Sequence, residues 1–141
     1  MAKSIEVRHY MLQKPVTVTA RMNIFEASHH ILKNKVSGVT VVDDDDNLVG
    51  MLSELDCLRA MIQSVYNDGG SYVATVEEMM TREIEVNHPH DDIIDVASSM
   101  LDHKHRRRPV VVDGKLVGQV TCRQILKAIK DFVGPEDPDE R

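Results

Sequence analysis

The most concentrated chemistry in this sequence is a basic run, Lys104-His105-Arg106-Arg107-Arg108. Such a run can contact the phosphates of a nucleic acid, or it can be a solvated helix end whose cations interact favourably with the helix dipole. The chain as a whole carries a net charge of −6, which argues against a general nucleic-acid binder. Nucleic-acid binding through Arg106–Arg108 therefore remains only a minor alternative.

Histidine, cysteine and aspartate residues raise the question of a metal site. None of the histidine spacings matches a zinc signature, and Cys57 and Cys122 are far apart in sequence. The four consecutive aspartates at residues 43–46 lack the alternating ligands, central glycine and distal glutamate of a calcium loop. We therefore expect surface histidines, a charged hairpin tip and no metal. The paired histidines are His29 and His30, His88 and His90, and His103 and His105.

The sequence shows no arrangement typical of catalysis. Serine, histidine and aspartate residues occur, but no pattern places a nucleophile beside a base, and there is no glycine-rich phosphate loop. We predict that the chain is not an enzyme and uses no catalytic cofactor.

Composition is typical of one globular domain of ordinary size. The chain has 141 residues, of which 42% are hydrophobic and 28% charged, and it contains no tryptophan. No apolar run approaches the roughly 18 residues that cross a bilayer, and the first six residues contain no hydrophobic signal region. We expect a cytoplasmic protein that does not enter the membrane.

The chain contains an internal repeat, in which Ile24-x-x-Ala27 recurs as Ile94-x-x-Ala97 at an offset of 97 − 27 = 70 residues. The offset falls to 116 − 48 = 68 in the last matching segment because the second turn is shorter. The matches keep the same order through both halves, so chance is a poor explanation. They pair residues 7–11 with 76–80, 16–18 with 84–86, 40–42 with 109–111, and 48–53 with 116–121.

Each repeat predicts the order strand, helix, strand, strand, helix. The first strands span residues 16–19 and 84–87, and the hairpins pair 39–42 with 48–52 and 109–112 with 116–120. Asn23 and either Asp91 or Asp92 are candidate N-caps for the first helices, and Asp113-Gly114 is a strong two-residue turn signal. The predicted apolar helix positions are Ile24, Ala27, Ile31 and Leu32; Ile94, Ala97 and Leu101; Leu55, Leu58 and Ile62; and Ile125, Ile129 and Phe132.

These elements predict a mixed α/β (α+β) fold of two β-α-β-β-α repeats, packed through their sheets with pseudo-twofold symmetry and leaving grooves along the interface. The first repeat spans residues 1–66, a turn-rich linker spans 67–75, and the second repeat spans 76–133. Residues 134–141 are predicted to form a disordered acidic tail.

The ordered set of strand, amphipathic helix, Pro109-Val110-Val111, turn, Leu-Val-Gly and Ser/Thr at a helix start resembles the cystathionine-β-synthase (CBS) domain. Two copies in tandem resemble the paired arrangement called a Bateman module, here of the standalone bacterial type. The resemblance covers residues 7–66 and 76–133 and departs at Thr40, where the family has proline. It implies that the grooves bind an adenosine-containing ligand and that the role is regulatory.

Carried over by position, the family pattern implies one complete ligand groove. A carboxylate accepts hydrogen bonds from both ribose hydroxyls, and a hydroxyl with backbone N–H groups at a helix start suits a phosphate. Ser-x-x-Asp at a helix start is also a common cap, so the structural interpretation stays open. The implied contacts are Ser53 for phosphate, Asp56 for ribose, Val86 and Asn87 for the base, and Arg106, Arg107 and Arg108 for phosphates.

The second groove departs from the pattern. Thr121 matches the hydroxyl, but Gln124 replaces the carboxylate, and the partner positions Val18, Ser37 and Gly38 carry no charge. We therefore expect a weaker or empty second groove.

We predict a module that binds AMP, ADP, ATP or S-adenosylmethionine in the groove between the repeats and regulates an effector protein. A ligand-free interaction scaffold is the alternative. We also expect a homodimer, because the family buries the apolar helix faces around Leu55, Leu58, Ile62, Ile125 and Ile129 against a second chain.

Overall fold

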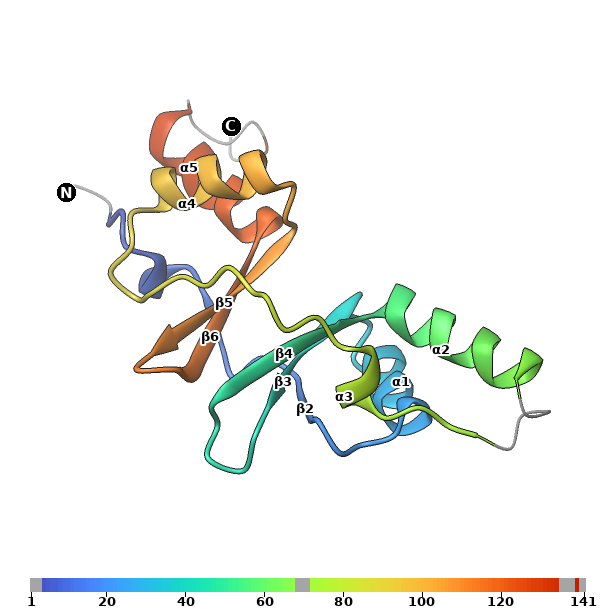
Figure 1. The fold of residues 1–141 in the computed structure, drawn as a ribbon. Coiled ribbons are helices and arrows are strands. Elements are labelled where there is room, and N and C mark those ends of the chain that lie inside the picture. The colour runs from blue at the N-terminus through green and yellow to red at the C-terminus, as the bar shows by residue number, and fades with distance from the viewer. Residues whose placement is uncertain (1–3, 68–71, 135–138, 140–141) are drawn as a thin grey trace. The chain divides into compact units, whose positions relative to one another are not determined.

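The structure is a computed structural model that describes residues 4–67, 72–134 and 139. Its elements form two compact units, each with its own three-stranded sheet and helices (Figure 1). We call residues 15–84 and 114–116 the first-repeat unit, and residues 1–14, 85–113 and 117–141 the second-repeat unit. The predicted mixed α/β class is confirmed. The predicted tail and the centre of the predicted linker lie outside the described residues, apart from Gly134 and Asp139.

In the first-repeat unit, the sheet order is β2-β3-β4. Strand β2 (Thr17–Thr19) pairs parallel with β3 (Gly38–Val42), which pairs antiparallel with β4 (Leu48–Ser53). Helix α1 (Ile24–Lys33) connects β2 to β3, as a parallel pair requires, and helix α2 (Glu54–Tyr66) follows β4. In the core of this unit, apolar side chains of β3 pack with those on the inner faces of both helices.

In the second-repeat unit, the sheet order is β1-β6-β5. Helix α4 (Ile93–His103) leads into β5 (Arg107–Val112), β6 (Lys115–Thr121) and helix α5 (Cys122–Val133). Strand β1 (Leu12–Gln13) joins the far edge of β6 in antiparallel register. The two predicted hairpins are therefore present, and Asp113 and Gly114 both have the positive φ that their turn requires.

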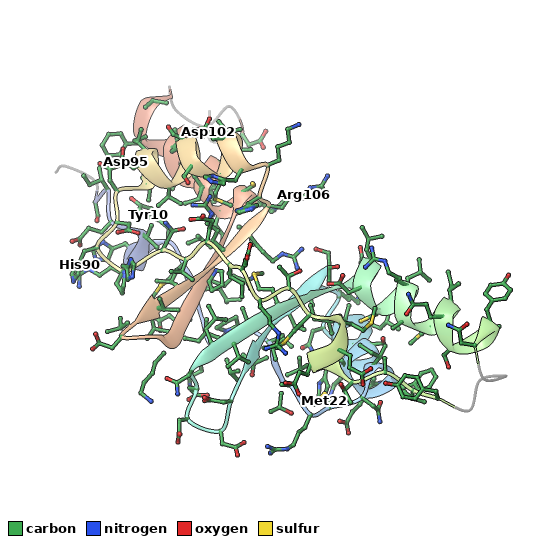
Figure 2. All side chains as sticks on the ribbon, viewed as in Figure 1. Tyr10, Met22, His90, Asp95, Asp102 and Arg106 are labelled. Atoms are coloured by element: carbon green, nitrogen blue, oxygen red, sulfur yellow. The ribbon has the colours of Figure 1, made fainter. Side chains whose placement is uncertain are left out.

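The end segments of the two sequence repeats are exchanged between the compact units. The 3-10 helix η1 (Val7–His9) belongs to the second-repeat unit, whereas α3 (Val76–Met79) belongs to the first-repeat unit. Val7 and Val76 occupy equivalent repeat positions, and both are fully buried in the core of the unit that they join. His90 lies beside the N-terminal segment and is 2.8 Å from Glu6 (Figure 2).

The exchange explains the glycine in each Leu-Val-Gly motif. A Cβ added at Gly50 would lie 2.5 Å from Met80 Sδ, and one added at Gly118 would lie 2.6 Å from Met11 Sδ and 2.9 Å from the Leu12 carbonyl oxygen. Each end segment therefore passes so close to its sheet that a side chain is excluded at the glycine.

The predicted strand at residues 84–87 is wrong. Only Asn87 pairs with β5, through Asn87 N to the Pro109 oxygen and Val111 N to the Asn87 oxygen, both at 2.9 Å. The next amide, His88 N, donates to Asp91 Oδ2 at 2.8 Å within a local turn. This bond competes with further backbone pairing to β5.

Several helix faces also differ from the prediction. Asn23 and Asp92 cap α1 and α4 as expected. Leu32, Ile94 and Leu101, however, are exposed, since Ser28 completes the inner face of α1 and Ile93, Val96 and Met100 that of α4. Ile125, expected on an exposed face, is buried. Apolar spacing alone did not distinguish the inner from the outer stripe of these helices, because both stripes carry large apolar residues. No helix in the described part of the chain has the length and hydropathy to cross a membrane.

Candidate functional site

The start of α2 carries Ser53 and Asp56, the core of the predicted ligand set. Ser53 Oγ accepts a hydrogen bond from Asp56 N at 3.1 Å, and Asp56 Oδ2 accepts one from Ser53 N at 2.9 Å. This reciprocal pair is a capping box, so the structural interpretation of Ser-x-x-Asp is correct. Asp56 Oδ1 is the more available oxygen, because its partner is the exposed Arg59 at 3.2 Å and the carboxylate side chain is 15% exposed. Asp56 therefore keeps one oxygen with which it could bind a ligand hydroxyl.

The same unit contains three residues predicted for the second groove, and two of them contact this helix start. Gly38 pairs with Ser53 across β3 and β4, and Glu54 N donates to the Ser37 carbonyl oxygen at 2.9 Å. Val18 is buried in the core, so it can offer only its backbone. Because the Glu54 and Asp56 amides are already bonded, this helix start offers a phosphate fewer free N–H groups than the sequence implied.

The start of α5 repeats this geometry in the second-repeat unit. Thr121 Oγ1 accepts from Gln124 N at 3.2 Å, and Gln124 Oε1 accepts from Thr121 N at 3.0 Å. Cys122 N donates to the Arg106 carbonyl oxygen at 2.9 Å, as Glu54 N does to Ser37. Gln124 thus fills the same capping position as Asp56 with a neutral amide. The capping role is conserved between the repeats, whereas the charge is not.

The three arginines of the basic run lie in different environments. Arg106 is exposed, Arg107 is half-buried at the start of β5, and Arg108 is only 2% exposed. Arg108 Nε donates to His105 Nδ1 at 3.2 Å, and its second terminal nitrogen lies 3.4 Å from His103 Nδ1. The run is therefore not a single cationic surface, and the hydrogen-bonding neighbours of the buried Arg108 are histidines rather than carboxylates among the described residues.

One histidine beside Arg108, His105, has a shifted pKa. Burial lowers the pKa of His105 below 6.5, with the Arg108 and His103 charges acting in the same direction and Glu85 opposing them. A neutral His105 is also what the geometry requires, because Nδ1 accepts the bond from Arg108. The sequence analysis did not predict that Arg108 is buried beside His103 and His105. The only indication in the sequence was that Arg108 aligns with Val39 of the first repeat, which is buried.

Val86 and Asn87 were predicted to contact a base. Asn87 is buried, and its Nδ2 donates to Asp91 Oδ2 at 3.2 Å. Its Oδ1 is buried with no hydrogen-bond partner among the described residues. Buried polar atoms are rarely left in this state, so Asn87 Oδ1 is an acceptor that a donor such as an amino group could satisfy after a small rearrangement. Val86 is half-buried beside it.

Other reactive side chains do not converge. The described residues contain no group of three or more histidine, cysteine, aspartate or glutamate side chains that could hold a metal ion. Burial raises the pKa of the Cys57 thiol, with Asp56 adding to the rise and Ser28 opposing it. Cys57 therefore packs as a small apolar residue on the inner side of α2.

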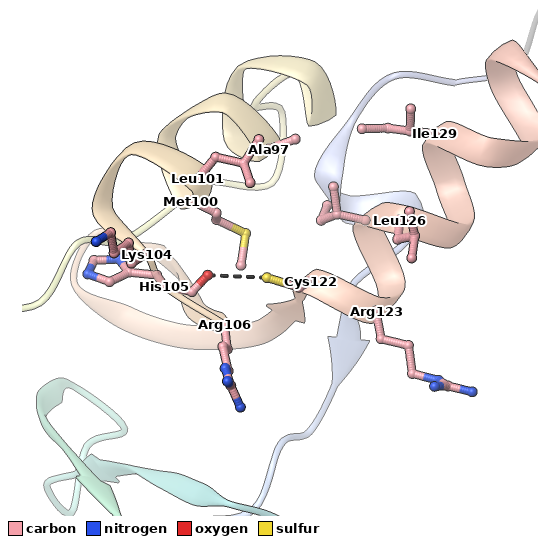
Figure 3. A pocket seen from close by; sticks show the side chains of 11 residues that line it. Ala97, Met100, Leu101, Lys104, His105, Arg106, Cys122, Arg123, Leu126 and Ile129 are labelled. Atoms are coloured by element: carbon pink, nitrogen blue, oxygen red, sulfur yellow. Dashed lines mark hydrogen bonds between the residues drawn. The ribbon is translucent and has the colours of Figure 1, made fainter.

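The second-repeat unit also has a groove between α4 and α5 that sequence reasoning missed (Figure 3). Its volume is about 750 Å³. Arg106, Lys104 and Arg123 contribute to its lining, together with apolar side chains of both helices.

Comparisons with known proteins agree with this architecture. Residues 7–63 and 76–131 each match the model of the CBS domain. CBSX2, solved in complex with AMP, is 28% identical with a TM-score of 0.80, covering 92% of this chain and 98% of that chain. The CBS domain pair of protein MJ0100, solved with 5′-methylthioadenosine and S-adenosyl-L-methionine, is 25% identical with a TM-score of 0.76 over the same shares.

Longer proteins also match. An uncharacterized protein of Methanocaldococcus jannaschii is 29% identical over 123 residues, which is 87% of this chain and 42% of the relative. Inosine-5′-monophosphate dehydrogenase of Halalkalibacterium halodurans is 31% identical over 122 residues, 85% of this chain and 23% of the enzyme. The chain thus spans less than half the length of these curated relatives. The two family matches, the two sheets and the paired capping boxes establish that this chain belongs to the CBS domain family as a tandem pair.

Proposed function

We propose that this chain is a regulatory module that binds an adenosine-containing nucleotide and transmits its binding to an effector protein. The observation that carries the proposal is the likeness to CBSX2 in complex with AMP, at a TM-score of 0.80 over 92% of this chain. The likeness to the MJ0100 pair, whose ligands are also adenosine derivatives, supports the same ligand class.

We assign candidate ligand residues in each unit by itself. From the first-repeat unit we assign Ser53 and Asp56, because Asp56 Oδ1 is bonded only to an exposed arginine and can exchange that partner for a ribose hydroxyl. From the second-repeat unit we assign Asn87, whose Oδ1 lacks a partner among the described residues, and the cations Arg106 and Arg107. Val86 would contact the base through its backbone or side chain. Arg108 is reassigned from a phosphate contact to a buried support of the strand that carries Arg106 and Arg107, because its guanidinium faces the histidines.

A thermal-shift screen with AMP, ADP, ATP, S-adenosylmethionine and adenosine tests the proposal. Selective binding to the folded state at a hundredfold excess over Kd adds about 2.7 kcal/mol, which raises the Tm of a domain of this size by roughly 5–10 °C. We expect at least one phosphate- or sulfonium-bearing adenosine ligand to give such a rise. If none of the five shifts the Tm at millimolar concentration, the nucleotide proposal fails and the ligand-free scaffold remains.

We also propose a twofold homodimer formed through α2. The large side chains Leu55, Leu58, Ile62 and Val65 are exposed along one stripe of α2, while its inner face carries the small residues Cys57, Ala60 and Ser64. A continuous exposed apolar stripe marks an interaction surface. Light scattering should report twice the 15.9 kDa chain mass, and Leu58→Asp should shift the protein toward the monomer. A purely monomeric wild-type protein at micromolar concentration would contradict this assignment.

A further inference from the structure

The segment that runs beside β5 in the second-repeat unit pairs with that strand at one residue. Asn87 N donates to the Pro109 oxygen, and Val111 N donates to the Asn87 oxygen, both at 2.9 Å. In a parallel ladder of this register, the next bond toward the chain start would run from the amide of residue 109 to the Glu85 oxygen. Proline has no N–H, so this bond cannot form. The Glu85 carbonyl oxygen therefore has no hydrogen-bond donor among the described residues.

The first repeat continues its ladder at the equivalent place. The registers of the two sheets put Thr40 at the position of Pro109 and Val18 at the position of Asn87. Thr40 has an N–H, and in the first repeat β2 pairs with β3 as far as Thr17. Thr40 and Pro109 are both fully buried, so the two sites differ little in their surroundings. A single backbone N–H therefore separates the longer ladder from the interrupted one.

A second unpaired acceptor lies two residues after Glu85. Asn87 is 7% exposed, and its Oδ1 atom is buried without a hydrogen-bond partner among the described residues. Reversal of the amide does not relieve this, because Nδ2 donates to Asp91 Oδ2 at 3.2 Å and the reversed amide would set Oδ1 against that carboxylate. In the first repeat, the equivalent Val18 is apolar and packs in the core. The fold therefore does not require an amide at this position.

We propose that residues 85–87 select a purine with an amino group at position 6, as in adenine, over a 6-oxo purine. An amino group supplies two N–H donors for the two acceptors, the Glu85 carbonyl oxygen and Asn87 Oδ1, whereas a 6-oxo group is itself an acceptor. Buried acceptors left unpaired disfavour the wrong ligand. Pro109 is a positioning residue, because it keeps the Glu85 oxygen out of the ladder. This selectivity presupposes the nucleotide function proposed above.

A water molecule is the other group that can satisfy Asn87 Oδ1. With water as its partner, Asn87 would contribute to folding stability and would not distinguish one base from another. The preference between two nucleotides is therefore the measurement that separates the two roles.

Calorimetric titration of the full chain with AMP and IMP tests the proposal, because these nucleotides share ribose and phosphate and differ at position 6 of the base. Asn87→Val and Pro109→Thr install the residues of the first repeat. The first variant removes one acceptor, and the second supplies the N–H that the Glu85 oxygen lacks. Thr40→Val is the matched control, since it changes the position equivalent to Pro109 and keeps the N–H. Amide hydrogen exchange at residue 109 reports whether the ladder bond forms in Pro109→Thr.

We expect the wild-type chain to bind AMP about tenfold more tightly than IMP. Asn87→Val and Pro109→Thr should each weaken AMP about tenfold and leave IMP within a factor of about two, whereas Thr40→Val should change neither. The amide of residue 109 should be protected in Pro109→Thr. Asn87→Val should keep a cooperative thermal melt, because an apolar side chain replaces an unpaired buried acceptor.

Equal wild-type affinities for AMP and IMP would overturn the proposal, as would an Asn87→Val variant that binds AMP normally, loses both nucleotides equally or no longer melts cooperatively. Wild-type AMP affinity in Pro109→Thr, or an unprotected amide at residue 109, would refute the role of Pro109. A wild-type chain that does not bind AMP would also overturn the selectivity. The thermal-shift screen with the other adenosine ligands then decides the proposed function separately.

Discussion

Replacement of Asp56 by glutamine separates the two roles of this residue. In the folded chain, Asp56 Oδ2 caps α2 through Ser53 N at 2.9 Å, and Oδ1 pairs with Arg59 at 3.2 Å. Gln124 performs the capping role in the second repeat at 3.0 Å, so glutamine can occupy this position without loss of the cap. Asp56→Gln should therefore preserve the fold and remove only the carboxylate charge.

The expected magnitudes follow from these contacts. The exposed i,i+3 ion pair with Arg59 contributes about 0.3–0.5 kcal/mol, so Asp56→Gln should lower the free energy of unfolding by no more than about 0.5 kcal/mol. Asp56→Ala also removes the side-chain half of the capping box and should lower it by about 1–1.5 kcal/mol. Loss of a charge-assisted hydrogen bond to the ribose should weaken nucleotide affinity about 10- to 100-fold in either variant.

Urea unfolding and calorimetric titration with the nucleotide chosen by the screen measure the two effects separately. Gln124→Ala is the matched control, since it removes the equivalent cap and should leave the nucleotide affinity within a factor of about two. Our reasoning is refuted if Asp56→Gln retains wild-type affinity, because the carboxylate then has no ligand role. It is equally refuted if Gln124→Ala abolishes binding while Asp56→Gln does not, because the functional site would then lie at the other helix start.

The remaining predictions concern phosphate recognition, the buried arginine and sheet packing. Replacing Arg106 and Arg107 together by alanine should weaken AMP binding by about 2–4 kcal/mol while affecting adenosine much less; equal losses in titrations of both ligands would contradict phosphate contact. Arg108→Leu should raise the free energy of unfolding by about 1–3 kcal/mol in urea melts, because it removes a buried charge whose hydrogen-bond acceptor, His105, is neutral; a destabilised variant would show that the guanidinium is fully compensated. Since the pKa of folded His105 is lowered below 6.5, the unfolded chain binds more protons on the acid side, so stability should fall as the pH drops below about 6.5, and less steeply in Arg108→Leu; identical pH slopes would refute this coupling. Gly118→Ala should cost about 1–3 kcal/mol in thermal melts, because the new Cβ would lie 2.9 Å from a backbone oxygen; a variant with wild-type Tm would show that the N-terminal segment yields easily.

The sequence alone identified the secondary-structure elements, caps and turns that depend on neighbouring residues. The helix-hairpin-helix order of both repeats, and the leading strand of the first, followed from the matches between the halves, from the caps at Asn23 and Asp92, and from the turn at Asp113-Gly114, all of which depend on neighbouring residues. The family resemblance followed from the same ordered motifs. These features are local, so they can be inferred without knowing which distant segments meet.

Only the tertiary structure decided which residues face inward and which segments pair across the chain. Leu101 and Ile125 are both large and apolar, yet Leu101 is exposed and Ile125 is buried. The side of each helix that becomes buried depends on how the helix packs against its sheet. The pairing of β1 with β6 and the burial of Val7 among residues of the second repeat depend on contacts more than eighty residues apart. The burial of Arg108 follows from the same cause, since a run of three arginines carries no local signal that one of them turns into the core.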